Sequence, residues 1–152
     1  MTMPNERTRS IRWGHEFLGE LISDNTVDES IRRIAQDLVA TYPPPDQILQ
    51  LIEANAKALP QPAAEALVKA AELWALLRRS HGGSEETRRS LLYVERHFPE
   101  SWIAESLARS LLHGVRTWLL PEDHDYSSKA CRPPAGQDAW STHSGLPKPP
   151  PR

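Results

Sequence analysis

The chain of 152 residues is poor in cysteine and in long apolar runs. Its one cysteine, Cys131, has no second cysteine to pair with, so an intrachain disulfide is excluded and nothing points to an oxidising compartment. The longest apolar stretch, near residues 73–77, is much shorter than the ~20 residues that span a bilayer. The first residues include arginines but no apolar core segment, unlike a signal peptide. We therefore expect a cytoplasmic protein without a membrane segment.

An excess of basic residues is also missing. The chain has 18 Lys and Arg against 20 Asp and Glu, which gives a formal net charge of −2. Proteins that bind nucleic acids usually carry a basic footprint that attracts the phosphate backbone. The charge balance therefore argues against a nucleic-acid partner.

The patterns that mark common catalytic and metal sites are absent as well. There is no glycine-rich phosphate loop and no Gly-x-Ser-x-Gly turn around a nucleophile. The histidines lack the spacing of a zinc site, and the only acidic cluster around one of them is 123–125, near the C-terminus. The sequence thus predicts a protein that is not an enzyme, with no catalytic residues, no cofactor and no metal.

The chain is rich in proline, and the prolines are unevenly distributed. Half of the fourteen lie from Pro121 onward, where proline, serine, glycine and charged residues replace periodic apolar residues. Such a segment has too little apolar surface to offset the entropy lost on ordering, and its last seven residues, 146–152, favour an extended polyproline conformation. We expect a helical domain over 1–120 and a disordered, Pro-rich tail over 121–152.

Within 1–120, apolar residues recur every three or four positions, and no run shows the two-residue alternation of a strand. This period predicts an all-α fold, a compact bundle or array of about six short helices. The apolar stripes place the expected helices near residues 5–22, 27–42, 45–59, 63–79, 85–98 and 102–118.

Local signals indicate where several of these helices start and stop. Thr26 and Glu29 match a capping box, and Ser84 is a favourable N-cap for the fifth helix. The prolines at 43–45 should stop one helix and open the next. Gly82–Gly83 should supply a left-handed exit from the fourth helix.

Two parts of the chain, 6–46 and 85–122, resemble each other and suggest an internal duplication. Duplicated helical hairpins would explain the similarity, although capped amphipathic helices also resemble one another in composition alone. The matched residues are Glu6, Thr8 and Arg9 with Glu85, Thr87 and Arg88, and Glu29, Ser30 and Ile31 with Glu105, Ser106 and Leu107.

The first third of the chain also shows a family resemblance. Residues 1–9 read Met-Thr-x-Pro-x-Glu-Arg-Thr-Arg, followed by Glu16-Phe17-Leu18 and by a helix that ends in Tyr42-Pro43. Over about residues 1–48 the chain resembles a group of short bacterial proteins of unknown function that open with the same pattern. That group usually has basic residues before the aromatic-proline pair, where this chain has Ala40-Thr41. The resemblance implies a bacterial origin and no particular reaction.

Two features are candidates for binding a partner. Five arginines on the first two helices could together grip a carboxylate, a phosphate or an acidic protein surface, although a solvated helix face balanced by glutamates would look the same. Trp140 lies in the expected tail, where an aromatic side chain can act as a short recognition element. The arginines are Arg7, Arg9, Arg12, Arg32 and Arg33.

These features favour a non-enzymatic, protein-binding helical protein of bacterial or mobile-element origin, acting as an adaptor, regulator or inhibitor in an unknown process. The alternative is a nucleic-acid-associated regulator that uses the arginines of the first or fifth helix. A third reading is a small enzyme whose site is assembled from distant residues. A homo-oligomer would follow if apolar faces on the third or fourth helix remain uncovered, which the sequence does not decide.

Overall fold

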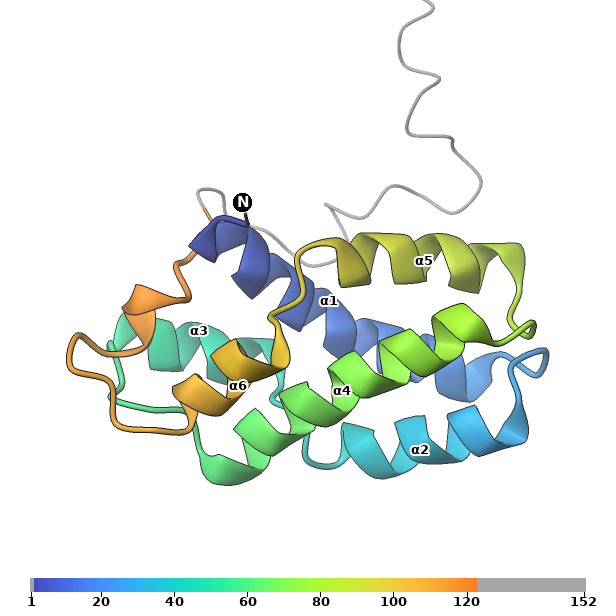
Figure 1. Cartoon of the computed structure of the whole chain (residues 1–152), viewed down its shortest axis with the longest axis horizontal. Coiled ribbons are helices and arrows are strands. Elements are labelled where there is room, and N and C mark those ends of the chain that lie inside the picture. The colour runs from blue at the N-terminus through green and yellow to red at the C-terminus, as the bar shows by residue number, and fades with distance from the viewer. Residues whose placement is uncertain (1, 123–152) are drawn as a thin grey trace, which may run out of the picture.

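The computed structural model describes residues 2–122, and these fold into six α-helices and one short 3₁₀ helix, with no strand among them (Figure 1). The predicted all-α fold is confirmed. The elements are α1 (Pro4–Ser23), α2 (Glu29–Val39), α3 (Pro45–Glu53), α4 (Gln61–Arg79), α5 (Glu85–Arg96), α6 (Ser101–Leu107) and η1 (Val115–Thr117). No helix in this part of the chain has the length and apolarity needed to cross a membrane.

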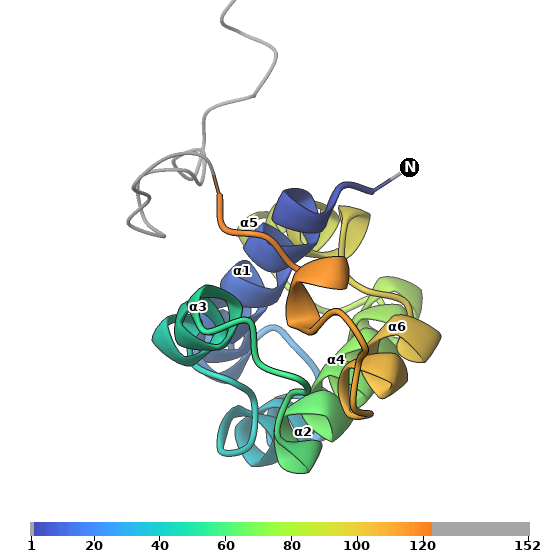
Figure 2. The same ribbon diagram turned by 90° about the vertical axis from the view of Figure 1, so that its left-hand side faces the viewer.

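The two longest helices, α1 and α4, are joined by two bridging helices. Both α2 and α5 pack against α1 and also against α4, so these four helices enclose a common core. Helix α3 packs against α1 and η1, and α6 packs against α4. Figures 1 and 2 show this arrangement, with α6 and η1 at one end of the molecule.

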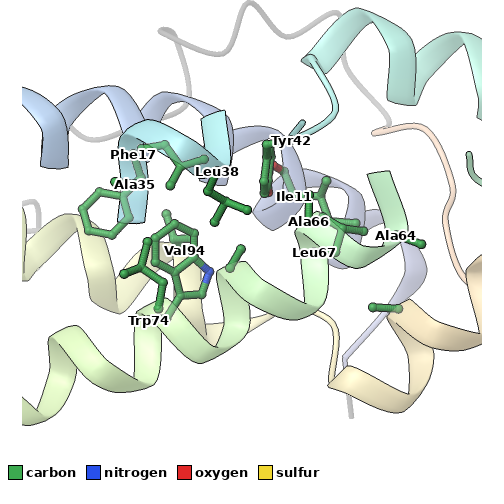
Figure 3. Close-up of a cluster of buried hydrophobic side chains, with 14 of the residues drawn as sticks. Ile11, Phe17, Ala35, Leu38, Tyr42, Ala64, Ala66, Leu67, Trp74 and Val94 are labelled. Carbon is green, nitrogen blue, oxygen red and sulfur yellow. The ribbon is translucent and has the colours of Figure 1, made fainter. Parts of the chain in front are cut away.

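Aromatic side chains fill the centre of this core (Figure 3). The rings of Phe17 and Trp74 lie with centroids 5.1 Å apart, and Phe98 meets Trp74 edge-on at 5.8 Å. The buried Tyr42 hydroxyl donates a hydrogen bond of 2.6 Å to the carbonyl of Ile11. Burial raises the pKa of Tyr42 well above its ordinary value. The Tyr42 hydroxyl is therefore buried but satisfied within the core.

Gly14 allows this close approach of α1 to the segment after α2. A Cβ atom at Gly14 would lie 2.3 Å from the Tyr42 hydroxyl oxygen and 3.3 Å from a ring carbon of Phe98. Because both rings are fixed within the core, neither can move aside without loss of packing. A glycine is needed here for space and not for backbone conformation.

One predicted helix start is confirmed and one is wrong. Ser84 caps α5, since its hydroxyl oxygen accepts the N–H of Thr87 at 3.1 Å. The capping box expected from Thr26 and Glu29 does not form, and α2 begins at Glu29. Thr26 instead donates both its N–H and its hydroxyl to the carboxylate of Asp24, which takes the N–H that Glu29 would accept in a capping box.

Asp24 also joins two parts of the chain that are distant in sequence. Besides Thr26, its carboxylate accepts the N–H of Ser84 at 2.9 Å and the hydroxyl of Thr87 at 2.6 Å. Partial burial pushes the pKa of Asp24 up, but the hydrogen bonds from Ser84, Thr26 and Thr87 outweigh it and hold the pKa well below its ordinary value. The charged carboxylate thus fastens the end of α1 to the start of α5.

The fourth helix ends at the predicted residue but without the predicted glycine cap. Helix α4 stops at Arg79 with Ser80 in an extended conformation, and only Gly83, at φ +99°, takes the expected left-handed geometry. The side chain of Arg88 replaces a Gly cap by donating to the carbonyls of Leu77, at 2.8 Å, and Ser80, at 2.5 Å.

The last predicted helix is wrong in length, because α6 ends at Leu107 and not near residue 118. Backbone groups of the α3–α4 connection compete for this stretch. The carbonyls of Ala56 and Lys57 accept the N–H groups of Val115 and Leu111, both at 2.8 Å. Val115 and Leu119 are fully buried, and the segment 108–122 packs with no helix other than η1. We call this segment the strap.

The two halves that resemble each other in sequence pack differently. Helix α2 lies against α1, whereas α6, its expected counterpart, lies mainly against α4. The duplication stays a prediction. Pro121 and Glu122, which were expected to begin the tail, fall within the described residues, and Glu122 contacts α1.

Candidate functional site

An open groove runs between α2 and α4, with a volume of about 400 Å³. Its aliphatic lining is Leu38 and Leu73, which are buried at the floor, and Ile34 and Leu76, which are 40% and 39% exposed. Large aliphatic side chains that face water across a shared groove mark a surface suited to apolar contact with another molecule.

Both walls of the groove repeat one spacing. Helix α2 contributes residues 34, 37 and 38, the turn after it contributes 41, and α4 contributes 69, 72, 73 and 76. On α4 the spacing i, i+3, i+4 and i+7 is one face of a helix over about two turns, or roughly 10 Å, and on α2 the residues at i, i+3 and i+4 form one face over about one turn. The lining is therefore a regular helical surface and not a fissure between loops.

The rim of the groove carries exposed charged side chains. Asp37, Lys69 and Glu72 line it together with Thr41. Within residues 2–122, none of these three charged side chains makes a hydrogen bond or an ion pair. The rim therefore has two carboxylates and one ammonium group, all open to a ligand.

The arginines of α1 lie elsewhere and contact the strap that follows α6. Arg7 donates to the carbonyl of Trp118 at 2.7 Å and lies over its ring at 5.6 Å. Arg9 pairs with Glu122 at 2.9 Å, and Arg12 binds the other oxygen of the same carboxylate. We call these five residues the arginine clasp.

The arginine clasp is largely closed to solvent. Arg7 and Arg12 are buried, and the side chain of Glu122 is only 4% exposed. Burial lowers the pKa of Arg7, while the nearby carboxylate of Glu100 acts against this. Two of the predicted binding arginines of α1, Arg9 and Arg12, thus already hold a carboxylate of their own chain, and Arg7 binds a backbone carbonyl.

The remaining predicted binding residues are not brought into this cluster. Arg33 forms an exposed i, i+4 pair with Glu29 at 3.1 Å on α2, and Arg32 reaches Asn25 at 3.4 Å. Such exposed contacts contribute little to stability. Trp140 lies outside the described residues, as does the acidic and histidine run at 123–125.

A second exposed apolar feature is an aromatic pair near the strap. Trp102 is 52% exposed and meets Trp118 edge-on with centroids 5.3 Å apart. Its indole N–H donates to Glu100 at 2.6 Å, which fixes the ring. Neither tryptophan lines the groove between α2 and α4, so the pair is a separate exposed apolar feature.

We find neither a group of metal ligands within residues 2–122 nor a match of the chain to a known protein. Among the described residues, no group of three or more His, Cys, Asp and Glu side chains is placed to hold a metal ion. Comparison of the chain with protein-family models, with curated proteins and with solved structures finds no match in any of the three. The bacterial family resemblance of the first third stays a prediction.

The groove residues were not singled out in the sequence, although a signal was present. Ile34 belongs to the apolar stripe of α2, and stripe residues are expected in the core. Helix α4 has apolar residues at 73, 74, 76 and 77, which cover more of its circumference than one buried face requires. That excess predicts a second apolar contact on the side of Leu76.

Proposed function

We propose that this protein is a non-enzymatic, protein-binding helical module, an adaptor, regulator or inhibitor that takes apolar side chains of a partner into the α2–α4 groove. The observation that carries the proposal is the pair of partly exposed aliphatic side chains, Ile34 and Leu76, that line one groove together with the buried Leu38 and Leu73. Covering them with a partner would remove apolar surface from water, which stabilises a complex by about 25 cal/mol for each Å² buried.

The chemistry of the groove supports binding more than catalysis. Its carboxylates and its amine are not hydrogen-bonded to one another or to any other group in residues 2–122, so no acid–base pair is preassembled there. The polar groups with the largest pKa shifts, Asp24 and Tyr42, serve internal hydrogen bonds and do not line the groove.

The test is a selection from a displayed peptide library with the full chain as bait. We expect enriched peptides to bind the wild type and the Leu92→Glu variant alike, and to bind Leu76→Glu at least tenfold more weakly. Leu92 is a matched control, because it is 68% exposed on α5 and lies outside the groove. Circular dichroism should show the same helicity for all three proteins.

Peptides that bind Leu76→Glu as tightly as the wild type would contradict a function that depends on this groove.

The alternative hypothesis of a nucleic-acid regulator predicts binding that weakens steeply with added salt. It draws no support from the arginines of α1, since Arg7, Arg9 and Arg12 are engaged in the arginine clasp.

A further inference from the structure

The shape of the α2–α4 groove narrows the kind of partner, and this inference rests on the proposed function. Both walls are helices, and their backbone groups are used within each helix. An extended peptide binds mainly through backbone hydrogen bonds to a free sheet edge, which helical walls do not offer. A helix binds through side chains alone, so it suits a groove of this construction.

The length of the lined surface indicates how much of a partner helix would be held. The lining of α4 runs over i, i+3, i+4 and i+7, which is about two turns or roughly 10 Å, and α2 lines the groove over about one turn. A third helix seated between them would use the same spacing, since helices pack by placing such rows into one another's grooves. Two or three aliphatic residues of the partner would fill the space.

The charges on the rim indicate the polar residues of that helix. Asp37 on α2 and Glu72 on α4 lie on opposite walls, and Lys69 is the only basic residue that lines the groove. Both carboxylates lack an ion-pair partner in the described part of the chain. A basic residue on each flank of a partner's apolar stripe would meet a carboxylate, whereas an acidic residue would meet repulsion.

We infer that the α2–α4 groove binds an amphipathic helix of a partner protein, with aliphatic residues at i, i+3 or i+4, and i+7, flanked by Lys or Arg. Ile34, Leu38, Leu73 and Leu76 receive the aliphatic side chains. Asp37 and Glu72 receive the basic ones.

The sequences of the enriched library peptides test this partner class. We expect an aliphatic stripe at helical spacing with an excess of Lys and Arg beside it. The best peptide, synthesised with its Lys and Arg retained or all changed to Glu, is then titrated against the full chain by fluorescence anisotropy. The basic form should bind at least tenfold more tightly than the acidic form at low salt.

Charge reversal of the protein completes the test. The double variant Asp37→Lys/Glu72→Lys should bind the basic peptide at least tenfold more weakly and gain affinity for the acidic one. Glu86→Lys/Glu105→Lys is the control with the same net charge, because both residues are exposed and lie outside the groove. It should bind the basic peptide like the wild type does.

The outcomes separate the partner class from the proposed function. Peptides that depend on Leu76 but show no basic excess, or that are extended and Pro-rich, would overturn the inferred helix and leave the groove as a binding site. Peptides indifferent to Leu76→Glu would overturn both. A concentration-dependent dimer of the full chain in sedimentation, lost in Leu76→Glu, would make a second copy the occupant and so overturn the inferred partner.

Discussion

The two sides of this molecule use charge in opposite ways. On the side of α1, the guanidinium groups of the arginine clasp and the carboxylate of Asp24 are all spent on internal hydrogen bonds. On the side of α2 and α4, Asp37, Lys69 and Glu72 have no such partner within residues 2–122. A cluster of charged residues in the sequence therefore says little about binding until its internal partners are known.

The apolar residues follow the same division. Beneath α1 they are fully covered, as Phe17 and Trp74 show, whereas Ile34 and Leu76 are left half exposed beside a groove. In small proteins stability comes mainly from buried apolar area and from satisfied buried polar groups. The core that α1 shares with α2 and α4 thus stabilises the fold, and the outer face of α2 and α4 at the groove is available for contact.

The sharpest way to break this comparison uses two adjacent leucines of α4. Leu77→Ala should cost about 3 kcal/mol, because Leu77 is fully buried and the change leaves a cavity. Leu76→Ala should cost less than about 1 kcal/mol, because that side chain is already partly in water. Urea denaturation measures both, and equal losses would show that Leu76 belongs to the core.

A second matched pair tests the close contact between α1 and Tyr42. Gly14→Ala should destabilise the fold by about 2 kcal/mol, because the new methyl group would overlap the Tyr42 hydroxyl oxygen. Gly19→Ala should be stabilising by up to about 1 kcal/mol, since it lies in the same helix with no atom within 4 Å of the added Cβ. A thermal melt in which Gly14→Ala is as stable as the wild type would refute the packing described for Gly14.

The Asp24 network predicts a pH effect. Because the pKa of Asp24 in the folded state lies below its unfolded value, its contribution is present near neutral pH and is lost as pH falls through about 4 and below. Asp24→Asn should lower the free energy of unfolding by about 1–2 kcal/mol at pH 7. The stability of this variant should also fall less with acid than that of the wild type. Denaturation curves at pH 7 and pH 3 check this, and an unchanged pH dependence in the variant would contradict it.

The smallest expected effect separates the arginine clasp from ordinary surface pairs. Glu122→Gln should cost about 1 kcal/mol, because Arg9 and the buried Arg12 lose a charged acceptor. Glu29→Gln should cost no more than about 0.5 kcal/mol, since its pair with Arg33 is exposed. If both variants lost the same small amount of unfolding free energy, the arginine clasp would contribute no more to stability than an exposed ion pair does.

The fold class could be predicted from the sequence because it depends on local periodicity and on proline and serine punctuation. Six helices were expected and six occur in residues 2–122, and Ser84 caps α5 as predicted. The capping of α2 and the length of α6 could not be predicted, since Asp24 and the carbonyls of Ala56 and Lys57 act from outside the local pattern. Tertiary partners decided both cases.

The candidate site was harder to predict for the same reason. The arginines of α1 were visible as a cluster, but their partners, Trp118 and Glu122, lie more than a hundred residues away in sequence. Ile34 and Leu76 look like core residues on their own helices, and only the packing of α2 against α4 leaves them at a groove. Which stripe residues stay uncovered is a property of the assembled bundle.

The most direct test of the account is a methyl and amide NMR titration of the full chain with a peptide from the library selection. The account predicts that the largest shifts fall on Ile34, Leu38, Leu73 and Leu76, with little change at Arg7, Arg9 and Arg12. Shifts concentrated on the arginine clasp, with the groove methyl groups unmoved, would contradict it.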